Sequence, residues 1–174
     1  PKQFLLLNDL PVLMHTIKQF SHFEKIVLVL PQSQFDYWEG LCDKYSFTKN
    51  YILVAGGETR FHSVKNGLER VDEKSIVAIH DGVRPLISTT LINKLVENTK
   101  NDSGVIPIIP VKDSVRKIQG KKSTHVNRSD LYKVQTPQCF LSSEIKGAYA
   151  QDFSNNFTDD ASVFESNGGE ITKY

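Results

Sequence analysis

Residues 76–85 read IVAIHDGVRP, and this stretch carries the pattern that decides the fold. Its first four residues are apolar, include β-branched side chains and do not alternate with polar residues. That pattern is typical of a strand buried on both faces of a parallel sheet. Charged residues follow directly at its end. Three further runs of similar composition lie at residues 26–30, 51–54 and 105–109.

Helical patterns lie between these runs. Apolar residues recur at helical spacing over 13–20, 64–71 and 91–96, and Ser88 precedes the last of these as a possible cap. Because strand and helix patterns alternate, we predict an open, twisted, mostly parallel α/β sheet flanked by helices, with right-handed crossovers. Further helices are expected from near Ser142 and near Thr158, and a last strand at 170–172.

The segment from about 112 to 136 interrupts this alternation. It holds no pattern for a crossover helix, and QG at 119–120 separates two short runs of strand type. Lys and Arg are dense here, whereas acidic residues are few. We predict a protruding β-arm. Pro107 and Pro110, at its start, favour an edge strand or a bulge.

Length and composition limit the classes of protein. The 174 residues fit a single domain spanning 1–174, and a net charge of +1 argues against nucleic acid or a membrane as a partner. No apolar run approaches the ~20 residues that cross a bilayer. Cys42 and Cys139 match no metal or redox spacing, so a cytoplasmic location is expected. We expect the chain to belong to a longer protein that continues beyond both ends.

Ligands of open α/β sheets bind at the carboxyl ends of the strands, so the residues there are candidates. Gly56 and Gly57, before Glu58, would let a backbone approach a ligand, although a tight turn is the interpretation that the pair alone favours. Asp81 and Arg84 could contact a sugar hydroxyl and a phosphate, or simply pair with each other. Thr158 alone is best explained as a helix N-cap.

The motifs are more specific together than separately. In chain order they are PKQ at 1–3, GGETRFHSV at 56–64, HDGVRP at 80–85, PVKDS at 110–114, NR at 127–128, TPQ at 136–138 and TDDAS at 158–162. This set resembles the 2-C-methyl-D-erythritol 4-phosphate cytidylyltransferase family over essentially the whole chain. The resemblance implies a Rossmann-like fold and transfer of CMP from CTP to a sugar-alcohol phosphate.

The resemblance also implies roles for individual residues. Lys2 would stabilise charge at the α-phosphate and, with Arg128, act in catalysis. Nucleotide binding would fall to Gly57, Glu58, Ser63, Asp81 and Gly82. The acceptor pocket would hold Asp81, Arg84, Ser114, Arg128, Thr136 and Thr158.

Family members are homodimers that exchange the arm, so Ser114 and Arg128 would serve the partner's site. Mg²⁺ is expected, held mainly through the CTP phosphates. The resemblance places a glycine-rich phosphate loop before Pro1 and a further lysine after Tyr174.

Three alternatives stay open. A ribitol 5-phosphate cytidylyltransferase would share the nucleotide motifs. A catalytically silent nucleotide-binding domain would fit a chain without the glycine-rich loop. Nucleic-acid binding through the basic arm is disfavoured, because the net charge is near zero and the arm lacks interleaved aromatic residues.

Overall fold

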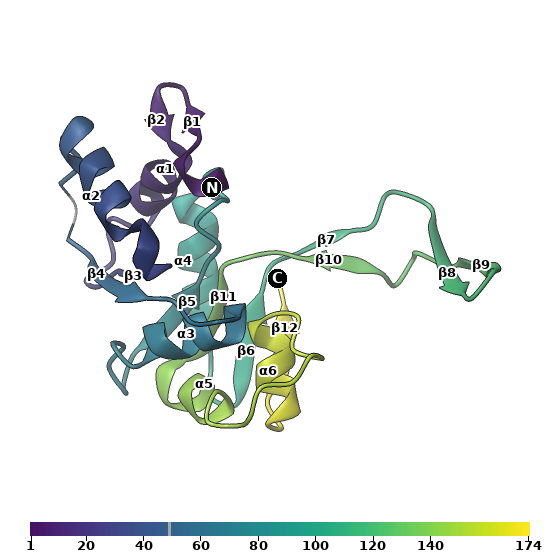
Figure 1. Ribbon diagram of the computed structural model, residues 1–174. Helices are drawn as coiled ribbons and strands as arrows, with labels where there is room; N and C mark the ends of the chain where they lie inside the picture. Colours follow the sequence, from purple (N-terminus) through teal and green to yellow (C-terminus); the bar gives the residue numbers. More distant parts are fainter. Residues whose placement is uncertain (49) are drawn as a thin grey trace.

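The computed structural model describes residues 1–48 and 50–174 and has a mixed α/β body from which a long arm projects (Figure 1). Two sheets form the body. In the first, β3 (Val27–Leu30) pairs in parallel with β4 (Ile52–Ala55). The second has the order β12-β6-β11-β5. Its strands are β5 (Ile76–Ile79), β6 (Ser103–Ile106), β11 (Gln138–Leu141) and β12 (Glu170–Lys173).

The apolar runs form strands as predicted, but the expectation of a mostly parallel sheet is not confirmed. Strand β12 is parallel to β6, whereas β11 is antiparallel to both β5 and β6. The chain returns from the arm straight into β11, without a crossover helix, so it enters the sheet from the opposite end. Pro107 separates β6 from β7 (Ile108–Pro110), which belongs to the arm.

Helices occupy the predicted segments and one further segment. Those predicted are α1 (Val12–Gln19), α3 (Arg60–Leu68), α4 (Thr89–Asn98), α5 (Ser142–Ala148) and α6 (Asp160–Ser166). Helix α2 (Phe35–Lys44) was not predicted. The N-cap assigned to Thr158 is wrong. Asp159 caps α6 instead, because its carboxylate accepts a hydrogen bond from the Ser162 amide at 2.9 Å in a capping box.

Strand β11 divides the core into two layers, because successive side chains of a strand point to opposite faces. Phe140 is fully buried and packs in a cluster with residues of α3, α5 and α6. Cys139, its neighbour, is equally buried in a cluster with Leu95 of α4. Helices therefore cover both faces of this sheet, as in other layered α/β folds.

A third cluster packs α1 and α2 against β3. Trp38 of α2 is fully buried there, and its indole N–H donates to the Tyr51 hydroxyl at 2.8 Å. The N-terminal segment joins this cluster through Phe4. The short elements near it are η1 (Lys2–Phe4), β1 (Leu6–Leu7), β2 (Leu10–Pro11) and η2 (Gln32–Gln34).

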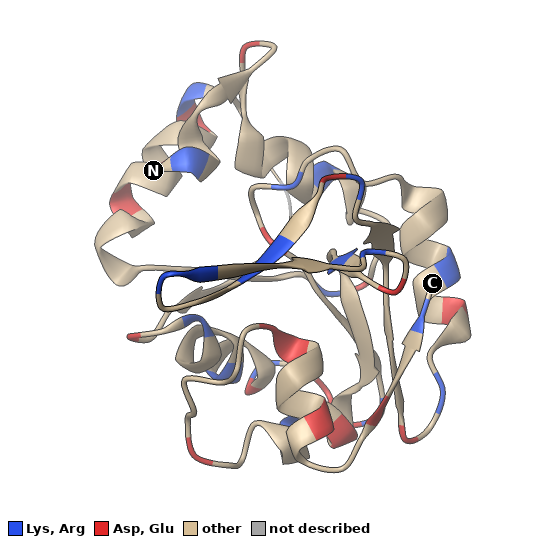
Figure 2. Ribbon diagram, turned by 90° about the vertical axis from the view of Figure 1, so that its right-hand side faces the viewer, with Lys and Arg blue, Asp and Glu red and all other residues tan. Residues whose placement is uncertain are grey.

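The arm consists of two antiparallel ribbons in succession. Strand β7 pairs with β10 (Tyr132–Val134), and β8 (Val115–Gln119) pairs with β9 (Lys122–Val126). Gly120 turns the outer ribbon with a φ of 60°, a conformation that glycine adopts at no steric cost. Most arm side chains are exposed, and Lys and Arg are prominent along it (Figure 2).

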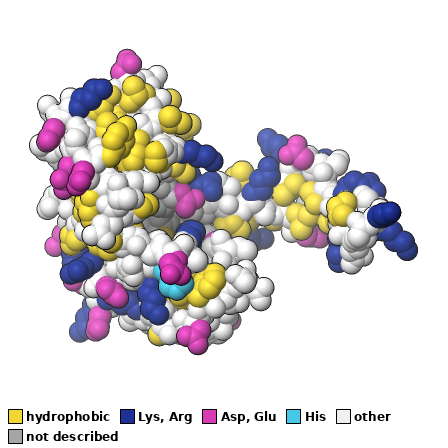
Figure 3. Space-filling model, viewed as in Figure 1, with side chains coloured by type: hydrophobic (Ala, Val, Ile, Leu, Met, Phe, Trp, Pro, Cys, Tyr) yellow, Lys and Arg dark blue, Asp and Glu magenta, His cyan; other side chains and the backbone are white. Residues whose placement is uncertain are grey.

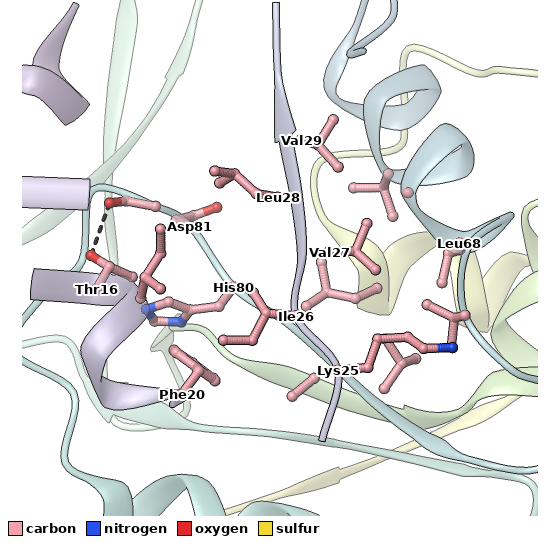
Figure 4. Close-up of a pocket in the computed structure, with 18 of the residues that line it drawn as sticks. Thr16, Phe20, Lys25, Ile26, Val27, Leu28, Val29, Leu68, His80 and Asp81 are labelled. Carbon is pink, nitrogen blue, oxygen red and sulfur yellow. Dashed lines mark hydrogen bonds between the residues drawn. The ribbon is translucent and has the colours of Figure 1, made fainter. Parts of the chain in front are cut away.

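A cleft of about 630 Å³, hereafter the slot, lies between β3 and β5 (Figure 4). Consecutive residues 24–31 and 75–83 line it, so both strands face it with their edges. In the described part of the chain, β3 pairs only with β4, and β5 pairs only with β11. No described helix is both long enough and apolar enough to cross a membrane.

Candidate active site

A cavity of about 300 Å³, hereafter the polar pocket, lies where β5 ends. It forms because β11 is antiparallel to β5 with Gln138 opposite Ile79, which sets the segment before β11 beside the segment after β5. The pocket gathers four of the predicted acceptor residues together with five others. The predicted ones are Asp81, Arg84, Thr136 and Thr158; the others that matter below are Arg60 and Gln135.

Asp81 and Arg84 form an ion pair on the wall of this pocket. Arg84 Nε donates to Asp81 Oδ2 at 2.7 Å, and its Nη1 donates to the Gln135 side-chain oxygen at 2.5 Å. The sequence left open whether Asp81 and Arg84 pair, and they do. Both side chains remain partly exposed, so each keeps hydrogen-bonding capacity toward the cavity.

Thr136 and His80 brace the backbone of this turn. The Asp81 amide donates to Thr136 Oγ1 at 3.3 Å, and Thr136 Oγ1 lies 2.9 Å from His80 Nδ1. His80 Nε2 lies 3.0 Å from the Arg84 carbonyl oxygen. Burial lowers the pKa of His80 below its ordinary value, so the ring favours its neutral form.

Arg60, the first residue of α3, enters the pocket from another side. Its Nη1 and Nη2 donate to the two carboxylate oxygens of Asp160 at 2.9 and 2.5 Å, and its Nε lies 4.0 Å from Asp81 Oδ1. Asp160 is fully buried, whereas Arg60 keeps 40% of its side chain exposed. Partial burial opposes the charge of Arg60, but the hydrogen bonds and charge of Asp160 outweigh it and raise the arginine's pKa.

The glycine pair forms a tight turn between β4 and α3. The Gly57 amide donates to Ser63 Oγ at 3.1 Å. A Cβ added to Gly57 would lie 2.4 Å from His62 Cβ, so the turn requires glycine. Ser63 lines the slot together with Asp81 and Gly82, whose carbonyl accepts from Thr16 (Figure 4). Glu58 is exposed beside the turn.

Five predicted residues line neither cavity: Gly57 and Glu58 of the glycine turn, and Lys2, Ser114 and Arg128. Lys2 sits in η1, and its neighbour Gln3 donates to the Gln34 side chain at 2.9 Å, which ties this segment to the end of β3. Ser114 and Arg128 lie on the arm, where Arg128 donates to the Lys112 carbonyl oxygen. The arm projects away from the body of the molecule (Figure 3).

Sequence reasoning gave no role to Arg60, Gln135 or Asp160. Arg60 stands in the quoted GGETR motif and Asp160 in TDDAS, but no sequence signal pairs residues 100 positions apart. Gln135 precedes the quoted TPQ. Within the described residues, 1–48 and 50–174, no group of three or more His, Cys, Asp or Glu side chains is placed to hold a metal ion.

Solved structures share this fold. The 4-diphosphocytidyl-2C-methyl-D-erythritol synthase of Anaerococcus prevotii superposes with a TM-score of 0.79 at 28% identity, covering 97% of this chain and 78% of that one. With the glycine turn and the polar pocket at its strand ends, the fold places the chain among the nucleotidyl-transferring transferases.

The sequence comparisons identify the family. The family model of 2-C-methyl-D-erythritol 4-phosphate cytidylyltransferase matches residues 1–172, and the chain belongs to this family. The enzyme of that name from Azobacteroides pseudotrichonymphae is 48% identical over 169 residues, which cover 95% of this chain and 76% of that protein. The Phocaeicola vulgatus enzyme is 47% identical over 174 residues, covering 98% and 80%.

Proposed function

We propose that the protein transfers CMP from CTP to 2-C-methyl-D-erythritol 4-phosphate in the non-mevalonate isoprenoid pathway. An acceptor phosphate oxygen attacks the α-phosphorus in line. The new P–O bond forms as the bond to pyrophosphate breaks, which leaves 4-diphosphocytidyl-2-C-methyl-D-erythritol. Such a reaction needs positioning and charge stabilisation more than covalent chemistry.

The observation that carries this proposal is the gathering of Asp81, Arg84, Thr136 and Thr158 around one polar pocket. An arginine fork suits phosphate, and a carboxylate with threonine hydroxyls suits a polyol. In the proposed arrangement Arg84, Thr136 and Thr158 bind the acceptor, while Asp81 accepts hydrogen bonds from acceptor and ribose hydroxyls.

The nucleotide base would lie at the turn between β4 and α3. There the backbone at Gly57, with Glu58 and Ser63, offers small polar groups suited to a pyrimidine edge, and Gly82 would lie beside the ribose. Ser63, Gly82 and Asp81 line the slot, and Asp81 also lines the polar pocket, which supports binding of base and ribose next to that pocket.

Lys2 would stabilise the negative charge that builds on the α-phosphate. The described residues build no metal cage, so Mg²⁺ in this site would take its oxygen ligands mainly from the CTP phosphates. When bound, the ion would neutralise phosphate charge.

The arm would mediate a homodimer and carry Ser114 and Arg128 into the partner's pocket. Its exposed apolar side chains support this role, among them Ile109, Ile118, Tyr132 and Val134. Residues 1–174 would then act as one nucleotidyltransferase domain with an exchanged arm at about 112–136. A cytoplasmic location stays a prediction from the sequence.

Pyrophosphate release by the full-length protein tests the proposal. The assay contains CTP and Mg²⁺ and compares methylerythritol phosphate with ribitol 5-phosphate as acceptor. We expect a large preference for methylerythritol phosphate. A preference for ribitol phosphate would reassign the acceptor, and no release with either would contradict the enzymatic function.

A further inference from the structure

Asp160 lies behind the polar pocket and contacts only other protein groups. It is the first residue of α6, its side chain is fully buried, and both of its carboxylate oxygens accept from Arg60. Tyr149, at the end of α5, donates its hydroxyl to Asp160 Oδ1 at 2.6 Å. Three helices thus meet at one carboxylate.

The contacts to Arg60 are directional. A planar guanidinium that gives both terminal nitrogens to one carboxylate is fixed in its plane, and its Nε–H is one of the three N–H groups left for other partners. Arg60 Nε lies 4.0 Å from Asp81 Oδ1, within ion-pair distance but beyond hydrogen-bond distance, while Arg84 Nε donates to Asp81 Oδ2 at 2.7 Å. Asp81 therefore lies between two arginines: Arg84 is hydrogen-bonded to it, and Arg60, oriented by a buried carboxylate, is within ion-pair distance.

We propose that Asp160, supported by Tyr149, is a positioning residue of the reaction: it orients Arg60, and Arg60 in turn sets the position of Asp81 in the pocket. Arg60 carries its charge to the pocket wall, but Asp160 neutralises it. Arg60 therefore contributes by orienting Asp81 and not by binding a free anion. The inference rests on the proposed function, in which Asp81 accepts hydrogen bonds from substrate hydroxyls.

Isosteric variants of the full-length enzyme test this chain of contacts. Asp160→Asn keeps the side-chain shape but points an NH₂ group at one terminal nitrogen of Arg60, which breaks the fork. We expect the KM values for CTP and for the acceptor to rise about tenfold, with kcat within about threefold. Arg60→Lys, which keeps the charge but loses the fork, is expected to behave similarly, and Tyr149→Phe to have a smaller effect in the same direction.

A matched control separates positioning from stability. Val163→Ala, in the same helix, removes apolar volume from a buried position in the core cluster that also contains Tyr149, but it removes no side-chain hydrogen bond to Asp160 or Arg60. It is expected to lower the melting temperature and leave both KM values unchanged. If Asp160→Asn also changes only stability and the amount of active enzyme, the positioning role is refuted.

A double-mutant cycle with Asp81→Asn tests the route of the effect. If Asp160 acts through Asp81, Asp160→Asn should change KM little once Asp81 has been replaced. Fully additive effects of the two substitutions would overturn the proposal.

A second readout does not depend on turnover. The Nε–H NMR signals of Arg60 and Arg84 should both shift in Asp160→Asn, because Asp81 links the two guanidinium groups. An unchanged Arg84 signal would contradict the inference even in an inactive protein. Inactivity of the wild type with every acceptor would instead contradict the proposed function.

Discussion

The wall of the polar pocket and the arm both carry cations, but these cations have different partners. At the pocket, Arg60 and Arg84 are each matched to a carboxylate at 2.5 and 2.7 Å. On the arm, Lys133 lies 3.7 Å from exposed Asp113, whereas Arg116 donates to Ser123 and Arg128 to the Lys112 carbonyl oxygen. Paired charges shape a cavity within one subunit. Cations without an acidic partner remain available to an anion brought from outside.

The first prediction tests how much more a buried ion pair than an exposed one contributes to the free energy of unfolding. Asp160→Ala leaves Arg60 without its fork and Tyr149 without its acceptor, and we expect the free energy of unfolding to fall by about 3 kcal/mol. Asp72→Ala is the control, because Lys25–Asp72 has the same 2.5 Å separation on the surface, where Asp72 is 75% exposed. The control should change stability little. If urea denaturation shows equal losses of unfolding free energy for the two variants, the contrast between the buried and the exposed ion pair is contradicted.

The second prediction concerns a cation that the structure does not pair. Lys2→Ala in the full-length protein should lower kcat by about 10²- to 10³-fold, because the transition state loses a charge that stabilises it. CTP affinity should change far less. Exposed Lys18, on α1, provides the control for loss of a lysine. A normal kcat in Lys2→Ala would remove this residue from the mechanism.

The third prediction asks whether the arm acts across subunits. Arg128→Ala should raise the KM of the acceptor about 10- to 100-fold, because a charge-assisted contact to its phosphate is lost. Mixing Arg128→Ala with Lys2→Ala should then restore activity. A mixed dimer contains one site with both residues intact only if Arg128 serves the partner. Activity no higher than the sum of the separate variants would place Arg128 in its own subunit's site.

The fourth and smallest effect is a pH dependence at the pocket. His80 has a pKa lowered mainly by burial, and Asp81 and Arg84, which face it, act in opposite directions. Below pH 6.5 the unfolded residue binds a proton that the folded one resists, so stability falls as the pH drops through this window. The loss cannot exceed about 1.4 kcal/mol per pH unit. His80→Gln should reduce the stability difference between pH 7.5 and 5.5; an unchanged difference would assign it to other groups.

Local patterns were enough to predict most of the elements near the site, but not all of them. Uninterrupted β-branched runs became β3, β4 and β5, and the arm followed from the absence of a helical pattern. Helix α2 was missed because Gly40 lies in its middle and Gln34 makes no side-chain cap. Strand β11 was missed because QCFL is only four residues long and directly follows Pro137, so it has no clear period.

The site was predictable only where its residues carry a local motif. Asp81 and Arg84 share one turn, so their pairing could be considered from the sequence. The contacts of Asp160 with Arg60 and Tyr149 arise from the packing of three helices, which no spacing along the chain encodes. The correction at the start of α6 has a similar cause. Thr158 and Asp159 are both capping residue types, and the placement of the Ser162 amide selects Asp159.

The exposed strand edges of the slot also bear on association between molecules in solution. Strand edges with free amide and carbonyl groups are templates for a further strand, from the same molecule or from another. An extended apolar segment inserted between β3 and β5 would hydrogen-bond both edges and merge the two sheets into one. If the slot stays open, the same edges invite pairing between molecules. Colloidal behaviour at high concentration, and not only activity, should therefore depend on whether a strand occupies this place.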